Sequence, residues 1–217
     1  MEKKGNDFVP YSLKVIPHIF PENKYAEILK SKIKQKNSFS LNFLNTLLTM
    51  IEDDNFLKQL MSFDFAIAQS IENQITQIEF DINLLLMKLQ TNPQEIFFEM
   101  NPGAQIIQCH PEIPHLWHQI VLSKNPREEI LSLRRQYSNW PQTIEHFFLC
   151  TILSNTEIHQ ISADFYKCTQ FLIEDSSSLE ALIFEYFDPS KIAPAELFVG
   201  KLISMGAILN FKTCGFQ

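Results

Sequence analysis

The chain has 217 residues, of which 45% are hydrophobic and 19 are Phe, whereas only 5 are Gly. This apolar content is sufficient for one large domain or two small ones, and it argues against a disordered chain. The formal net charge of -7 at pH 7 repels phosphate backbones, so non-specific binding to nucleic acid is disfavoured.

The sequence also bears on location and redox state. No apolar run reaches the roughly 18 to 20 residues that a membrane-spanning helix needs, and the first residues, Met1 to Asp7, are charged instead of forming a signal peptide. The four cysteines lack the paired spacing of zinc or redox motifs. We therefore expect a cytoplasmic protein with no membrane partner and with free thiols at Cys109, Cys150, Cys168 and Cys214.

The first part of the chain, residues 1–92, predicts an N-terminal arm followed by a helical bundle. Three prolines in residues 1–24 predict an irregular arm that lies on the surface or on a partner. Helical periodicity then favours helices over 41–51 and 56–61, a further helix that Asp64 would cap, and one over 82–89. Phenylalanines in this region would form either core or an exposed groove: Phe39, Phe43, Phe56, Phe63 and Phe65.

The second part, residues 93–141, is a connecting region. Short apolar runs at 96–100 and 105–109 flank Asn101-Pro102-Gly103, a turn sequence, and this arrangement predicts a β-hairpin. Residues 111–122 and 126–137 favour two short helices.

The third part, residues 142–217, predicts a winged-helix-like module with a small β-sheet. Runs at 145–152 and 157–161 favour a hairpin, and Ser162 would cap a helix that follows it. Ser177 with Glu180 forms a capping box for a second helix, and a third would end at Gly206 before a strand over 207–211. The expected fold class is therefore α+β and mainly helical.

A winged helix can read DNA or bind a peptide, so surface chemistry must decide between them. The predicted third helix offers only Lys201, with Glu196 nearby, which is too little positive charge for a DNA reader. A peptide would instead pair with the exposed edge of the hairpin, next to apolar pockets. The residues expected to bind it are Phe147, Phe148, Cys150, Ile152, Phe198 and Lys201.

The middle of the chain offers weaker signals. His115 and His118 lie one helical turn apart near Cys109, His110 and Glu112, but the spacing lacks the paired ligands of a structural zinc site, so we expect no metal site. No nucleophile motif or Gly-rich phosphate loop is present, and we expect no catalytic residue. The basic cluster at Arg127, Arg134 and Arg135 is either a solvated helix face or a docking surface for an acidic partner or peptide.

The stretch from Asp64 to Phe211 resembles the HvfC family, whose members accompany multinuclear non-haem iron oxidases. The resemblance rests on residues 92–104, on Pro111 to Trp117, and on the C-terminal hairpin and helices ending in residues 201–209, and it covers about two-thirds of the chain. One departure is that Pro114 stands where family members often carry a His, and His115 lies two residues before Trp117.

The resemblance implies a function for the chain as a subunit. It would form a heterodimer with a TIM-barrel iron oxidase and bind the leader of a ribosomally made precursor peptide whose cysteines the oxidase modifies, as the methanobactin-pathway protein MbnC does. The iron would belong to the partner, and this chain would hold no cofactor. The expected partner interface is His115, Trp117, His118 and Arg134. The alternative is a winged-helix transcriptional regulator that binds DNA.

Overall fold

A computed structural model describes residues 13–21, 24–27, 41–51, 54–73, 81–92, 95–137, 140, 143–152, 155–175, 182 and 192–213. By contacts the chain divides into two compact units, one of Met1–Gln69 with Cys109–Ile144 and the other of Ser70–Gln108 with Glu145–Gln217. This partition differs from the three consecutive parts expected from the sequence, because each unit combines two stretches that are distant along the chain.

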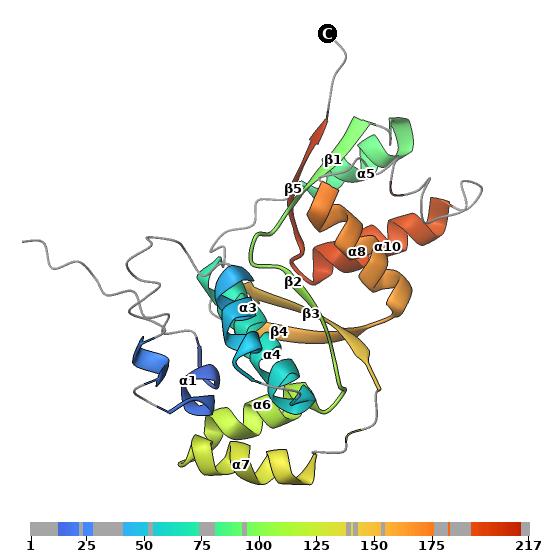
Figure 1. Cartoon of the computed structure of the whole chain (residues 1–217). Helices are drawn as coiled ribbons and strands as arrows, with labels where there is room; N and C mark the ends of the chain where they lie inside the picture. The colour runs from blue at the N-terminus through green and yellow to red at the C-terminus, as the bar shows by residue number, and fades with distance from the viewer. Residues whose placement is uncertain are drawn as a thin grey trace, which may run out of the picture. The chain divides into compact units, whose positions relative to one another are not determined.

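The first unit is helical in its described residues (Figure 1). It contains α1 (Ile16–Ile19), α3 (Leu41–Thr49), most of α4 (Asn55–Glu72), α6 (Ile113–Leu122) and α7 (Pro126–Gln136). The predicted helices over 41–51, 111–122 and 126–137 are thus confirmed within two residues at each end. Of the phenylalanines that could have formed a core or a groove, all but Phe39 are buried; Phe39 lies outside the described residues.

Helix α4 is longer than the sequence predicted. The expected break at Asp64 is wrong, since one helix runs without interruption from Asn55 to Glu72. Asp54 caps it instead, its carboxylate accepting the Leu57 N–H at 2.9 Å. Asp64 lies in the middle of the helix with no exposed surface, where a carboxylate needs hydrogen-bond donors from elsewhere in the fold.

The donors come from the N-terminal segment and from α6. The Asp64 carboxylate accepts the backbone N–H groups of Lys14, Val15 and Ile16 at 2.8 to 3.1 Å, and the Nε1–H of Trp117 at 2.7 Å. Burial raises the pKa of Asp64, and these four hydrogen bonds oppose that shift. The expectation of a surface arm is therefore wrong for the described part of it, because Val15 and Ile16 are fully buried.

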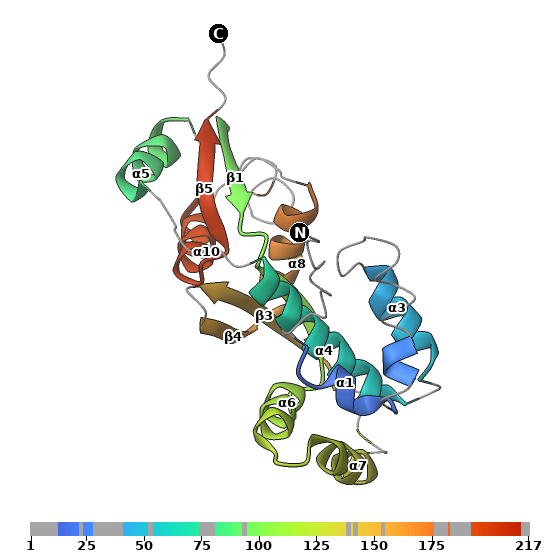
Figure 2. The same ribbon diagram turned by 90° about the vertical axis from the view of Figure 1, so that its left-hand side faces the viewer.

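The second unit contains two small β-sheets. Strand β1 (Ile96–Met100) pairs antiparallel with β5 (Ile208–Thr213), and the two lie side by side in Figures 1 and 2. The other sheet has the order β2 (Gln105–Cys109), β3 (Glu145–Ile152), β4 (Asn155–Ile161). The predicted hairpin over 145–161 is confirmed, but the one over 96–109 is wrong. Both of its strands form at the expected residues, yet they belong to different sheets.

The turn between β1 and β2 explains this separation. Asn101 O accepts the Ala104 N–H at 2.8 Å, so the predicted turn does form. The Asn101 side chain, however, bonds away from β2: its Nδ2 donates to Gly206 O at 3.0 Å and lies 3.2 Å from Cys150 Sγ. A Cβ on Gly103 would come within 3.0 Å of the Ser70 carbonyl oxygen, so the turn is packed against backbone and needs glycine there.

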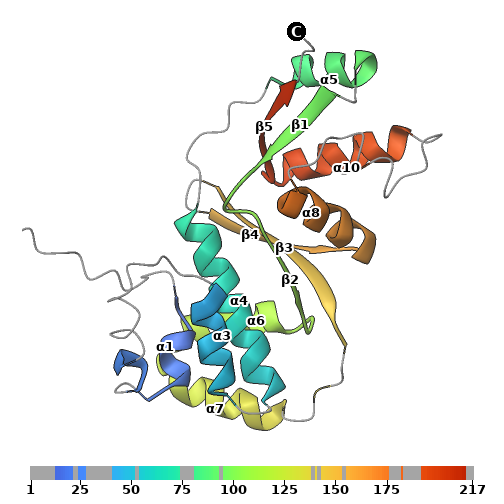
Figure 3. The ribbon, with the colours of Figure 1, turned by 45° about the horizontal axis from the view of Figure 1, so that its top comes forward.

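Helices α5 (Ile82–Thr91), α8 (Ala163–Asp175) and α10 (Ile192–Ser204) complete the described part of this unit, and α8 and α10 lie beside the strands in Figure 3. Ser162 caps α8 as predicted, its Oγ accepting the Phe165 N–H at 3.2 Å. Gly206 ends α10 with a φ of 69°, also as predicted. The helix expected from Ser177 lies outside the described residues except for Leu182, and the last strand pairs with β1 and not with the β3–β4 hairpin.

Replacing Asn101 should destabilise the second unit. We expect Asn101→Ala to lower the free energy of unfolding by about 2–4 kcal/mol, because the Gly206 carbonyl and the Gly103 N–H lose their partners in a buried site. Urea denaturation measures the change. The matched control is Asn83→Ala on the exposed face of α5, for which we expect a change below about 0.5 kcal/mol. Equal effects of the two substitutions would contradict the role given to Asn101.

Candidate peptide-binding site

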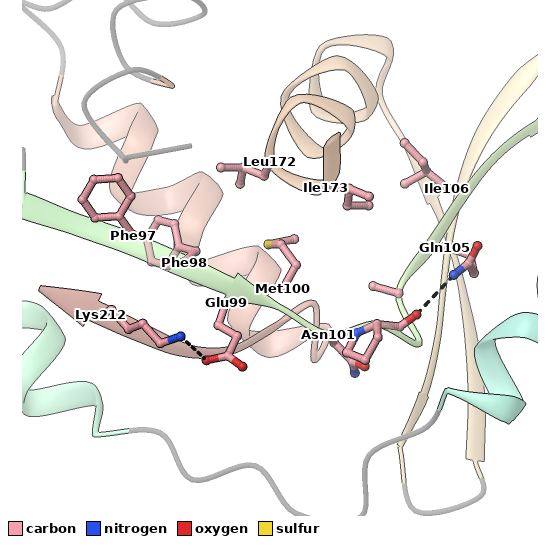
Figure 4. Close-up of a pocket in the computed structure, with 12 residues that line it drawn as sticks. Phe97, Phe98, Glu99, Met100, Asn101, Gln105, Ile106, Leu172, Ile173 and Lys212 are labelled. Carbon is pink, nitrogen blue, oxygen red and sulfur yellow. Dashed lines mark hydrogen bonds and ion pairs between the residues drawn. The ribbon is translucent and has the colours of Figure 1, made fainter. Parts of the chain in front are cut away.

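A cavity of about 550 Å³ lies beside β1 in the second unit. Its walls come from β1, from the turn after it, from the start of β2, from α8 and from Lys212 of β5 (Figure 4). The lining residues are Phe97, Phe98, Glu99, Met100, Asn101, Pro102, Ala104, Gln105, Ile106, Leu172, Ile173 and Lys212.

The cavity follows the edge of β1. Residues 97 to 100 all line it, although successive side chains of a strand point to opposite faces of the sheet. The lining thus includes residues whose side chains point to both faces of the sheet, as expected of a space that runs along the strand's edge. In Figure 4, Leu172 and Ile173 of α8 lie across from Met100, on the side of β1 away from β5. Among the described residues, β5 is the one strand that pairs with β1.

The direction of the β1 peptide groups follows from one hydrogen bond. The Asn101 N–H donates to Ala207 O at 2.7 Å, so this N–H points toward β5. The side to which a residue's backbone N–H and C=O point alternates along a strand. Those of Phe97 and Glu99 therefore also point toward β5, whereas those of Phe98 and Met100 point toward the cavity. The pairing with β5 is irregular between Glu99 and Met100. The extra residue, Leu209, belongs to β5, so the alternation along β1 is unchanged. Phe98 and Met100 therefore offer donors and acceptors to the cavity.

The cavity is apolar on the α8 side and polar at its rim. Met100, Ile106, Leu172 and Ile173 supply the apolar wall, and Ile173 remains 37% exposed. At the rim, Lys212 Nζ lies 3.5 Å from Glu99 Oε2, and both side chains are largely exposed. Strand backbone beside an aliphatic wall suits an extended peptide, which gains hydrogen bonds from the edge and burial from the wall.

The residues predicted to bind a peptide lie elsewhere. Phe147, Phe148 and Cys150 are buried on β3, which is the middle strand of its sheet and offers no open edge. A charge at Phe148 would thus disrupt the core and not merely a binding edge. Phe198 is buried against Phe165, and the Lys201 ammonium lies 4.6 Å from the centre of the Phe165 ring. The side chain of Ile152 is outside the described residues.

No local pattern in the sequence indicates which strand pairs with β1, so the sequence did not predict this site. The alternation of burial along Ile96–Met100 is consistent with a strand in either a hairpin or an open-edged sheet. Only the pairing with β5 shows which edge is used. Of the two outer strands of the other sheet, β2 contributes Gln105 and Ile106 to the cavity, whereas no residue of β4 lines it.

The residues predicted for the partner interface fall into two groups. His115 and His118 are exposed on α6 and accessible to a partner. Trp117 instead belongs to the interior of the first unit, with its ring 6.1 Å from that of Phe63 and its N–H on Asp64. Arg134 forms an ion pair with Asp54 of the same unit and is half exposed.

The residues considered for a metal site are not gathered around one point. In the part of the chain that the structure describes, no three His, Cys, Asp or Glu side chains are arranged to hold a metal ion. Cys109 and His110 are buried, and the His110 ring stacks on Trp140 with centroids 3.9 Å apart. The Nδ1 of His110 accepts the Glu112 N–H at 3.3 Å, so this nitrogen already has a hydrogen-bond partner within the fold.

The described cysteines are free and buried in the interior. Burial raises the pKa of the Cys109 thiol to about 12 and those of Cys150 and Cys168 to about 11. At neutral pH all three are thiols and not thiolates, which makes them poor nucleophiles and poor metal ligands. They contribute packing to the two units.

These thiols should react slowly in the folded protein. In a Cys214→Ser background at pH 8, we expect Cys109, Cys150 and Cys168 to react with an aromatic disulfide more than about a hundredfold slower than after denaturation, because burial suppresses the thiolate and blocks access. Absorbance of the released thiolate follows the reaction. Raising the pH from 7 to 9 should leave them mostly protonated, since the pKa values lie above that range. A thiol that reacts at the denatured rate would contradict this.

Comparison with known proteins gives no relative. No protein-family model matches the chain, and neither the curated proteins nor the solved structures searched contain a match. The resemblance to the HvfC family therefore stays a prediction. Within the described residues, no helix combines the length and the apolar character that crossing a membrane requires.

Proposed function

We propose that this chain is a non-catalytic subunit that binds an extended peptide along the edge of β1 that no described strand covers. The observation that carries the proposal is the cavity bordered by four consecutive β1 residues on one side and by Leu172 and Ile173 on the other. An unpaired strand edge attracts a further strand, and an apolar wall beside it adds burial that selects among peptides.

The resemblance to the HvfC family suggests which peptide this is. We propose that the bound segment is the leader of a ribosomally made precursor and that the partner is a TIM-barrel, multinuclear non-haem iron oxidase, as in methanobactin biosynthesis. The iron and the oxidation chemistry then belong to the partner. A subunit that holds the leader raises the effective concentration of the precursor's cysteines at that iron site.

The order of elements from β3 to β5 supports keeping a winged-helix-like module in this proposal. Strands β3 and β4, helices α8 and α10, and strand β5 follow one another in the expected order, with the helix predicted from Ser177 outside the described residues and with β5 paired to β1 instead of to the hairpin. The histidines His115 and His118 of the first unit belong to the predicted oxidase interface and are exposed. DNA binding gains no support from α10, where Lys201 lies over an aromatic ring of its own unit.

Removing one edge donor should weaken binding without unfolding the protein. Met100→Pro deletes an N–H that faces the cavity, and a strand tolerates proline where its N–H is not used in the ladder. Met100→Ala is the matched comparison, because it also removes the Met100 side chain from the cavity wall but keeps the N–H. We expect Met100→Pro to bind the leader peptide at least about tenfold more weakly than Met100→Ala in calorimetry. Equal losses in both variants would argue against strand addition.

The partner proposal has its own test. The chain is co-expressed with a TIM-barrel, multinuclear non-haem iron oxidase, and the two are purified through a tag on the oxidase. We expect a stable one-to-one complex, weakened by the double substitution His115→Glu with His118→Glu on the exposed face of α6. Failure of the parent proteins to co-purify would overturn the heterodimer and leave peptide binding at β1 to be judged by calorimetry.

A further inference from the structure

We infer that the segment held along β1 alternates apolar and polar residues, with its apolar side chains facing Met100 and Ile173. This inference rests on the proposed function and adds the sequence class of the bound peptide. It follows from the two faces of the β1–β5 sheet and from the position of α8.

The face of β1 that Ile96, Phe98 and Met100 share is turned toward the core. Ile96 and Phe98 belong to the buried cluster that also contains Leu172 of α8, and Met100 packs against that cluster. Phe97 and Glu99, on the opposite face, are partly or largely exposed. The sheet thus has one apolar face covered by helices and one face toward water.

A peptide strand that pairs with this edge of β1 extends the sheet, so its side chains alternate between the same two faces. Every second side chain of the added strand would lie over the helices, and the others would lie in water beside Phe97 and Glu99. A register shift of one residue would turn all the apolar side chains into water. The peptide must therefore alternate in polarity to bury all its apolar side chains against the wall, whereas a block of three consecutive apolar residues can bury only two of them.

Ile173 is positioned to contact the apolar side chains of the bound peptide. It lines the cavity and is 37% exposed, whereas its neighbour Leu172 is 1% exposed and belongs to the core. Substituting Ile173 therefore changes the cavity wall while leaving the core in place. Leu197 of α10 offers a matched control, because it is a large apolar side chain, 75% exposed, that does not line the cavity.

The test uses two capped synthetic peptides of identical composition on the full-length protein. One alternates, Ser-Leu-Thr-Leu-Thr-Leu-Ser-Lys, and the other groups the leucines, Ser-Thr-Thr-Leu-Leu-Leu-Ser-Lys. We expect the alternating peptide to bind at least about tenfold more tightly in calorimetry, because each additional buried leucine side chain adds favourable free energy. Ile173→Lys should remove this preference, and Leu197→Lys should leave it unchanged.

A third peptide, Ser-Leu-Thr-Asp-Thr-Leu-Ser-Lys, separates a specific contact from a general loss of folding. It should bind weakly to the parent protein and about tenfold better to the Ile173→Lys variant, in which an ammonium faces the aspartate. Equal affinity of the parent protein for the alternating and grouped peptides would overturn the inference but leave binding at the β1 edge intact. If neither the alternating nor the grouped peptide binds, both the inference and the proposed function fail.

Discussion

The second unit depends on how the Asn101 side chain is bonded. Its Nδ2 holds the carbonyl of Gly206 and its backbone N–H holds that of Ala207, so the end of β1 is fixed to the start of β5. Its Oδ1 accepts the Gly103 N–H, which shapes the turn that carries the chain into the other sheet. Because β2 leaves to pair with β3, nothing in the described chain returns to the second edge of β1, and that edge borders the cavity.

The cavity beside β1 offers groups that an extended peptide could use. Backbone of β1 borders it, and an exposed Glu99–Lys212 pair lies at its rim. Such groups recognise the backbone of an extended chain and leave specificity to the apolar wall. The described thiols are buried in the interior and contribute to packing. The buried Asp64 carboxylate anchors the N-terminal segment through its hydrogen bonds to backbone N–H groups. Asp64 therefore stabilises the first unit, whereas the backbone groups of β1 in the second unit are the ones proposed to bind a peptide.

Local sequence patterns predicted most of the described helices and strands, but they did not predict which distant strands pair with each other. Capping and turn chemistry located α8 through Ser162, the end of α10 through Gly206, and both strands around Asn101. Those signals act over a few residues. The partner of β1 is more than a hundred residues away in β5, and an alternating pattern is the same whichever strand pairs with it. Asp64 was wrongly predicted to cap a helix for the same reason, because its hydrogen-bond donors come from segments that are distant along the chain.

Residue-resolved hydrogen exchange of the free protein tests the open edge of β1 most directly. The account predicts alternation: the amides of Phe97 and Glu99, which face β5, should exchange slowly, and those of Phe98 and Met100, which face the cavity, should exchange at least about tenfold faster. Addition of the leader peptide should slow the second pair and leave the first unchanged. Uniform protection of all four amides in the free protein would mean that the chain itself covers this edge, and it would contradict the account.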